Sequence, residues 1–169
     1  LECKKQIIKK EIFNMVKIIS DSTCDLSPEL IAKYDIDILP LHILLGEDEY
    51  ADGKNITPEQ IYSWSDENKT TPKTSAPALT DAIELFKPYI DEGREIVCFS
   101  ISSSMSTSGN VMRIAAEELE AEDRITVIDS ANLSTGIGLL VIEAAIMAQN
   151  NHTVEEIVSA IETLKPNVR

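Results

Sequence analysis

The sequence predicts an α/β fold, a parallel-sheet three-layer sandwich with helices on both faces of the sheet. Short apolar runs rich in β-branched residues alternate with longer amphipathic segments, which is the pattern of a parallel sheet covered by helices. The chain has 169 residues, of which 43% are hydrophobic, and this size suits one globular domain better than two. Strands are predicted at residues 16–20, 36–45, 95–101 and 125–129.

The first helices have recognisable start signals. Ser27 and Thr57 are each followed by Pro and Glu, and an N-cap residue before a first-turn proline and an acid is typical of a helix start. This order predicts helices over residues 28–34 and 59–67. The polar segment 66–78 contains two prolines, so we expect it to form an extended loop.

The second half of the chain is predicted to be mainly helical between its strands. Thr153 and Glu156 form a capping box, which marks the start of the last helix. The helix that begins at Ser134 is apolar on nearly every side, so we expect it to be deeply buried. Apolar residues at helical spacing predict helices at residues 77–93, 107–122, 134–151 and 154–164.

The two ends of the chain differ from the middle. Residues 1–14 are basic and mixed, and we expect an extension, a helix of their own or vector-derived sequence there; the domain itself is predicted at residues 15–169. The leader lacks the apolar core of a signal peptide, and no apolar run reaches the roughly 20 residues needed to span a bilayer. We therefore expect a cytoplasmic protein with no integral membrane span. The last residues, 164–169, stop a helix and begin what resembles another strand, so we expect a chain cut at this point.

Charge and cysteine content exclude several functions. There are 15 Lys and Arg against 29 Asp and Glu, a formal charge of -14, which repels nucleic-acid phosphates and anionic lipid head groups. The three cysteines are widely spaced, without a CxxC or a Cys/His cluster. Neither a disulfide framework nor a zinc site is predicted.

Hydroxyl-rich loops are expected to meet at one edge of the sheet, because the carboxyl ends of parallel strands form the ligand crevice of such folds. A hydroxyl donates and accepts without bringing charge, so several of them with helix N–H groups can hold a carboxylate or a phosphate. For any single Ser or Thr, a role as N-cap or turn former is the alternative. The loops are Asp21-Ser22-Thr23, Thr74-Ser75, the serines of 100–108 and Asp129-Ser130.

Catalytic and metal sites find little support. A nucleophilic serine needs a base, and the two histidines are His42, within a strand, and His152, in a remote turn. No GxSxG elbow or GxxxxGK[ST] loop occurs, so we expect no catalytic residue. Asp21, Asp25 and Asp129 carry oxygen ligands suited to Mg²⁺, but a backbone or hydroxyl partner explains them equally well, and no metal is predicted.

Read together, four segments resemble the DegV family of bacterial fatty-acid-binding proteins over residues 16–169. The family's TSQP loop corresponds to Thr74-Ser75-Ala76-Pro77, and its ISSxLSGT motif corresponds to residues 101–108, with Met for Leu and Thr for Gly. Both differences leave the hydroxyls in place. The segments are KIISDSTCDLSPELIAKYDIDILPLHI, TPKTSAPA, IVCFSISSSMSTSGN and ITVIDSANLSTGIGLLVIEAA.

The resemblance implies a protein that buries a long-chain fatty acid in an apolar tunnel and holds its carboxylate with hydroxyls. It further implies no cofactor and no turnover of its own, but a carrier subunit that presents the fatty acid to a separate ATP-binding kinase subunit. A second α/β domain, which completes the tunnel in the family, is expected to be absent from this chain. The lipid-binding residues that the resemblance implies are Thr74, Ser75, Ser102, Ser103 and Ser106.

Two other functions stay open on the sequence. One is an enzyme acting on a phosphorylated or acyl substrate, with Asp21 or Asp129 as base or metal ligand. The other is a non-catalytic interaction domain whose serines only cap helices.

Overall fold

A four-stranded parallel sheet forms the centre of the molecule. The computed structural model describes residues 16–168, so the predicted leader at 1–14 lies outside the described residues. The strands are arranged in the order β2-β1-β6-β7, and every neighbouring pair is parallel. Their bounds are Lys17–Asp21 for β1, Ile36–Leu39 for β2, Ile96–Ser100 for β6 and Ile125–Asp129 for β7.

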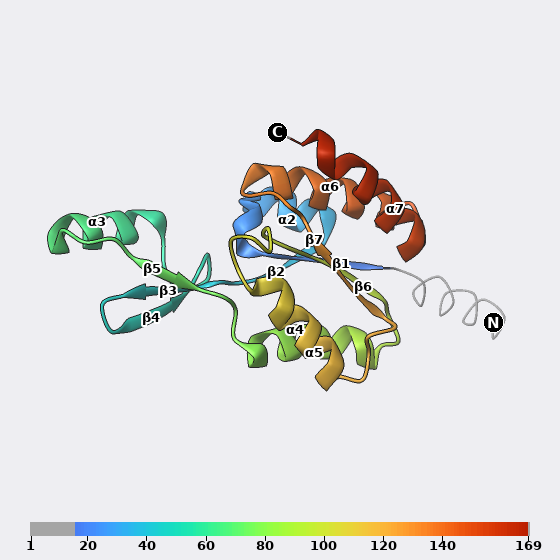
Figure 1. The fold of residues 1–169 in the computed structure, drawn as a ribbon, viewed down its shortest axis with the longest axis horizontal. Coiled ribbons are helices and arrows are strands. Elements are labelled where there is room, and N and C mark those ends of the chain that lie inside the picture. Colours follow the sequence, from blue (N-terminus) through green and yellow to red (C-terminus); the bar gives the residue numbers. More distant parts are fainter. Residues whose placement is uncertain (1–15, 169) are drawn as a thin grey trace.

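Helices cover both faces of this sheet, which confirms the predicted three-layer sandwich (Figure 1). The two central strands are buried on both sides, because their alternate residues face opposite layers. Ile18 and Val97 enter the core under one layer, whereas Ile19 and Cys98 enter the core under the other. One layer holds α2 (Pro28–Tyr34), α6 (Thr135–Gln149) and α7 (Val154–Leu164), and the other holds α4 (Leu79–Asp91) and α5 (Ser108–Glu118).

The prediction of one long strand over residues 36–45 is wrong. The segment forms two strands in different sheets, β2 and then β3 (His42–Leu45). The break lies at Pro40, which has no N–H to donate to a ladder. The next N–H, that of Leu41, donates to Ser22 Oγ at 3.1 Å instead of to a neighbouring strand.

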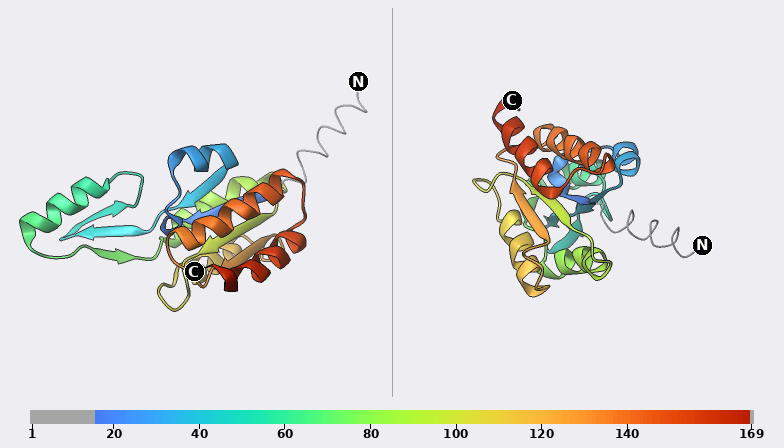
Figure 2. Two further views of the ribbon diagram at one scale, coloured as in Figure 1. Left: turned by 90° about the horizontal axis from the view of Figure 1, so that it is seen from above. Right: turned by 90° about the vertical axis from the view of Figure 1, so that its right-hand side faces the viewer.

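A second, antiparallel sheet follows this break, with the order β4-β3-β5. Its other strands are β4 (Asp48–Ala51) and β5 (Lys73–Ser75), and helix α3 (Pro58–Asn68) packs on it. We call residues 42–75 the arm, and Figures 1 and 2 show that it projects from the main body. Residues 66–78, predicted to form an extended loop, instead contain the end of α3 and the edge strand β5.

The arm has a small core of its own. Ile43, Leu45 and Ile56 are buried in it, and Ile61 and Trp64 of α3 pack against them. His42 ties the arm to the main body, because its ring nitrogens lie 2.6 Å from Glu49 Oε1 of β4 and 2.9 Å from Asp81 Oδ2 of α4.

Helix α6 is buried on one side only. Ile137, Leu140 and Val141 are at most 1% exposed, as predicted for a core helix, but Leu139 on the opposite side is 62% exposed. The helices α2 and α7 have the bounds that their capping signals predict. Over residues 16–168, no helix combines the length and the apolarity that crossing a bilayer requires.

Candidate functional site

A cavity of about 290 Å³ lies where the arm meets the carboxyl edge of the main sheet. Segments distant in sequence build it: the 3-10 turn Ser22–Cys24 after β1, strands β3 and β5 of the arm, and the loop after β6. Its walls combine apolar side chains with hydroxyls. The lining residues are Thr23, Leu41, Ile43, Asp52, Thr74, Ser75, Ala76, Ile101, Met105 and Ser106.

Three of the five predicted site residues meet at this cavity. Thr74 and Ser75 come from β5, where they pair with Ile43 and His42 of β3, and Ser106 comes from the serine loop. The predicted convergence of the TSAP loop and the serine loop on one hollow is therefore present. These segments lie far apart in the sequence, and the tertiary fold brings them together at the cavity.

Ser102 and Ser103 do not line the cavity. Ser102 Oγ lies 2.8 Å from Ser104 Oγ, and the backbone carbonyl of Ser102 accepts from the N–H groups of Met105 and Ser106. The backbone N–H of Ser103 donates to Asp129 Oδ1 at 3.2 Å. These two serines therefore shape the turn, which is the turn-forming role given above as the alternative.

The start of α5 holds Ser106 against the sheet. Ser106 Oγ lies 2.9 Å from Ser108 Oγ and accepts from the Ser108 N–H at 3.2 Å. Gly109 approaches the end of β6 so closely that a Cβ there would lie 2.8 Å from Ser100 Oγ. The absence of a side chain at this glycine thus allows α5 to begin directly above the strand.

Asp21 is a buried anchor of the loops rather than a free base. It is 0% exposed, and it accepts from Thr23 Oγ1 at 2.5 Å and from the Ile101 N–H at 2.8 Å. Burial raises the pKa of Asp21, and these hydrogen bonds oppose the rise. The carboxyl group joins the ends of β1 and β6, and it fixes the position of the Thr23 hydroxyl.

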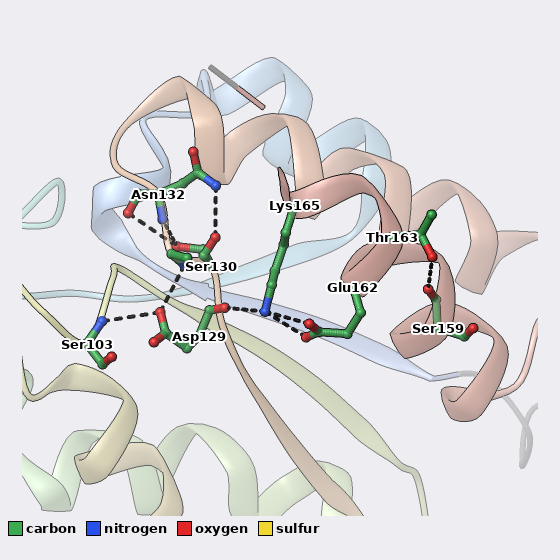
Figure 3. Close-up of polar contacts among 9 residues, drawn as sticks. Ser103, Asp129, Ser130, Asn132, Ser159, Glu162, Thr163 and Lys165 are labelled. Carbon is green, nitrogen blue, oxygen red and sulfur yellow. Dashed lines mark hydrogen bonds and ion pairs between the residues drawn. The ribbon is translucent and has the colours of Figure 1, made fainter. Parts of the chain in front are cut away.

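Asp129 organises the neighbouring loop in the same way (Figure 3). It accepts from the N–H groups of Ser103 and Ala131, at 3.2 and 2.9 Å. Lys165 donates to the Asp129 carbonyl at 2.9 Å and pairs with Glu162 at 2.8 Å. Burial would raise the pKa of Asp129, but the hydrogen bonds from Ser103 and Ala131 outweigh it and leave the pKa lowered. Its position is that of a loop anchor outside the cavity.

Metal ligands are not gathered in the described part of the chain, and its two histidines lie away from the cavity. No group of three His, Cys, Asp or Glu side chains within residues 16–168 has the geometry to hold a metal ion. Asp25 instead accepts from Ser134 Oγ at 2.5 Å. Neither His42 nor His152 lines the cavity, and His152 pairs with Glu156 at 2.9 Å on the surface.

The sequence prediction missed two polar lining residues. Thr23 belongs to one of the four hydroxyl-rich loops, so its signal was present, although the resemblance did not single it out. Asp52 follows β4, a strand of the arm that the sequence did not reveal, and nothing marked it as a site residue.

A larger groove of about 700 Å³ lies along α6 and α7. It contains none of the five predicted site residues, and it is shallow and open to solvent. The smaller cavity is the candidate site because it gathers hydroxyls from distant segments, which the larger groove does not. The lining residues of the groove are Met147, His152, Glu155, Glu156, Ser159, Ala160, Thr163 and Leu164.

Comparison with known proteins agrees with the resemblance noted above. Residues 15–169 match the model of the family described as "Uncharacterised protein, DegV family". A DegV domain-containing protein of Clostridium perfringens is 38% identical over 154 residues, which cover 91% of this chain and 55% of the relative. A similar protein of Clostridium acetobutylicum is 36% identical, with the same coverage.

Solved structures share the fold. A protein of Eubacterium ventriosum, described as a fat acid (stearic acid)-binding protein, is 35% identical with a TM-score of 0.80, over 88% of this chain and 52% of that one. A DegV family protein of Thermus thermophilus, described by its fatty acid binding, is 26% identical with a TM-score of 0.82, over 90% of this chain and 54% of that one.

The chain spans about half the length of the relatives that it matches. Within that half, the match to the family model and the fold shared with the solved structures agree. The protein belongs to the DegV family.

Proposed function

We propose that this protein binds a long-chain fatty acid and holds its carboxyl group with the hydroxyls of Thr74, Ser75 and Ser106. The observation that carries the proposal is the cavity at which β5 of the arm and the serine loop of the main sheet meet. Ser102 and Ser103 belong to the proposal as the residues that shape the turn. The fatty acids described for the similar proteins of Eubacterium ventriosum and Thermus thermophilus support the same ligand class.

The acyl chain would supply most of the affinity. Burying about 16 methylenes at about 0.8 kcal/mol each is worth on the order of 10 kcal/mol before the costs of association. Leu41, Ile43 and Ile101 give the cavity apolar walls next to its hydroxyls. Its volume of about 290 Å³ is at the small end for ligand sites, which run from about 300 Å³ upward. It therefore suits the head group and the first carbons, and we propose that a second domain completes the tunnel.

The wider role is a carrier rather than an enzyme. In this proposal the protein lacks turnover of its own and presents the fatty acid to a separate kinase subunit in the cytoplasm. The absence of both described histidines from the cavity lining supports a binding site over an acyl-transfer site, because a serine nucleophile needs an adjacent base.

The direct test is ligand identification. Protein purified from cells is extracted with solvent, and the extract is analysed by mass spectrometry. We expect fatty acid in stoichiometric amount with the full-length gene product. Thr74→Val and Ser106→Ala should each reduce the bound lipid several-fold, while Thr163→Val, on the surface of α7, serves as the matched control. Unchanged lipid content in both variants would contradict the assignment of these hydroxyls.

A further inference from the structure

His42 lies at the junction through which the arm joins the main body, and it contacts both sides of that junction. Its backbone is paired with Ser75 of β5, which lines the cavity. Its ring lies 2.9 Å from Asp81 Oδ2, in the first turn of α4. Only residues 76–80 separate Ser75 from Asp81, so His42 spans the connection that positions β5 against the main body.

Both ring nitrogens of His42 face a carboxylate. Nδ1 lies 2.6 Å from Glu49 Oε1 of β4, and Nε2 faces Asp81. A carboxylate can only accept hydrogen bonds, and a neutral imidazole has a hydrogen on only one of its two nitrogens. A neutral ring would therefore turn a lone pair toward one of the carboxylates, whereas the imidazolium donates to both. The arrangement is that of a protonated histidine.

The charged groups around His42 favour its protonated form. On the strands beside it, Lys73 lies two residues from its register partner on β5, and Asp52 lies one residue from its partner on β4. Glu49 and Asp81 are the groups bound to the ring. The hydrogen bonds that the ring donates, first to Asp81 and then to Glu49, raise the pKa of His42, and partial burial opposes the rise. The proton is therefore lost only above the ordinary titration range of histidine, which lies at about pH 6.5.

We propose that His42 is a positioning residue of the fatty-acid site and makes ligand binding sensitive to pH. As an imidazolium it fastens the arm to α4 and so holds Thr74 and Ser75 at the cavity. When it loses a proton to the solvent, it keeps the shorter bond to Glu49 and releases Asp81. The arm is then free to shift, and the hydroxyls hold the carboxyl group of the ligand less tightly. This inference rests on the proposed function, since it specifies how the same site is regulated.

The test measures the affinity of the full-length gene product for dodecanoic acid by calorimetry, between about pH 6 and about pH 9. A carboxyl group has an ordinary pKa of about 4, so the ligand stays ionised throughout this range. We expect binding to weaken about 3- to 10-fold as pH rises through the folded pKa of His42, which is the range of one lost hydrogen bond. The midpoint of this change should coincide with the titration of the His42 ring protons followed by NMR.

Two variants assign the effect to His42. His42→Gln does not titrate, so it should bind more weakly than the wild type at low pH and equally across the range. Asp81→Asn carries an NH₂ group that can donate to the neutral ring, so the tether no longer needs the proton and the low-pH affinity should persist to about pH 9. A merely structural role of Asp81 would not make this variant bind more tightly than the wild type at high pH. His152→Gln, which removes the surface pair with Glu156, is the matched control and should keep the wild-type profile.

The outcomes separate the two proposals. If dodecanoic acid binds with an affinity that depends on Thr74 but not on pH, or if the pH dependence survives in His42→Gln, the inference fails and the proposed function stands. If no fatty acid binds at any pH, both fail. If His42→Gln does not fold, Asp81→Asn decides alone, because a wild-type pH profile in that variant would overturn the inference.

Discussion

Gly138 is the position at which a single methyl group should disturb both the core and the site. It lies in α6 beside the turn that carries Thr23, and a Cβ at Gly138 would lie 2.6 Å from the carbonyl oxygen of Cys24 and 3.0 Å from Leu26 Cδ2. On an exposed helix, Gly→Ala would stabilise by about 1 kcal/mol. Here the new methyl would instead contact the carbonyl oxygen of Cys24, which ends the 3-10 turn Ser22–Cys24. The Asp21 side chain caps the start of that turn and holds it in place.

The expected result is a net loss of stability. Overpacking costs about 1 to 3 kcal/mol, and contact with a backbone atom argues for the upper part of that range, so Gly138→Ala should destabilise by about 1 to 2 kcal/mol after the helix gain. For a domain of this size, that lowers Tm by about 2 to 8 °C. Calorimetry or thermal unfolding followed by circular dichroism measures the change, and lipid binding should weaken because the turn shifts.

Gly136→Ala is the matched control in the same helix. Its Cβ would lie 2.9 Å from Asn132 Oδ1. This atom belongs to a side chain, which can shift at the cost of its hydrogen bond to the Ser130 carbonyl, whereas Gly138 meets a backbone atom. Gly136→Ala should therefore lose less stability than Gly138→Ala. If Gly138→Ala were as stable as the wild type, the turn after β1 would not be held rigidly against α6, and the account of how Thr23 is positioned would be wrong.

Three further predictions concern groups outside the cavity. The hydrogen bonds that the His42 ring donates to Asp81 and Glu49 raise the pKa of His42. Its protonated form therefore stabilises the fold at low pH, and this contribution is lost as pH rises from about 6.5 through the folded pKa. Urea unfolding of His42→Gln should show less dependence on pH in that window. Burial raises the pKa of Cys98 to about 12, so iodoacetamide should leave it unmodified until the protein unfolds, and labelling at the global unfolding rate or slower is the expected readout. Lys17→Met should destabilise by about 1 to 3 kcal/mol, because the Lys17 side chain is 2% exposed and its ammonium is paired with Asp35 and Asp37. Urea unfolding without such a loss would contradict that role.

Much of the main body follows from local sequence features. Strands β1, β6 and β7 are short β-branched runs, and α2 and α7 begin at capping signals that the chain itself supplies, so their bounds could be predicted closely. The long strand at 36–45 could not be divided correctly, because an apolar run with one proline is compatible with a bulge or an edge strand as well as with a change of sheet. The arm was missed for a different reason. Its strands are short and partly polar, and they are stabilised by pairing with each other.

For this protein, the sequence alone determined the fold class, the family and the hydroxyl-rich loops, since periodicity, caps and motifs are properties of neighbouring residues. Only the tertiary structure decided which hydroxyls share a cavity. Ser102, Ser103 and Ser106 look alike in sequence, yet only Ser106 lines the cavity, because the turn directs Ser103 to Asp129 and pairs Ser102 with Ser104. Thr23 and Asp52 join the lining through contacts between distant segments, and such contacts leave no local pattern in the chain.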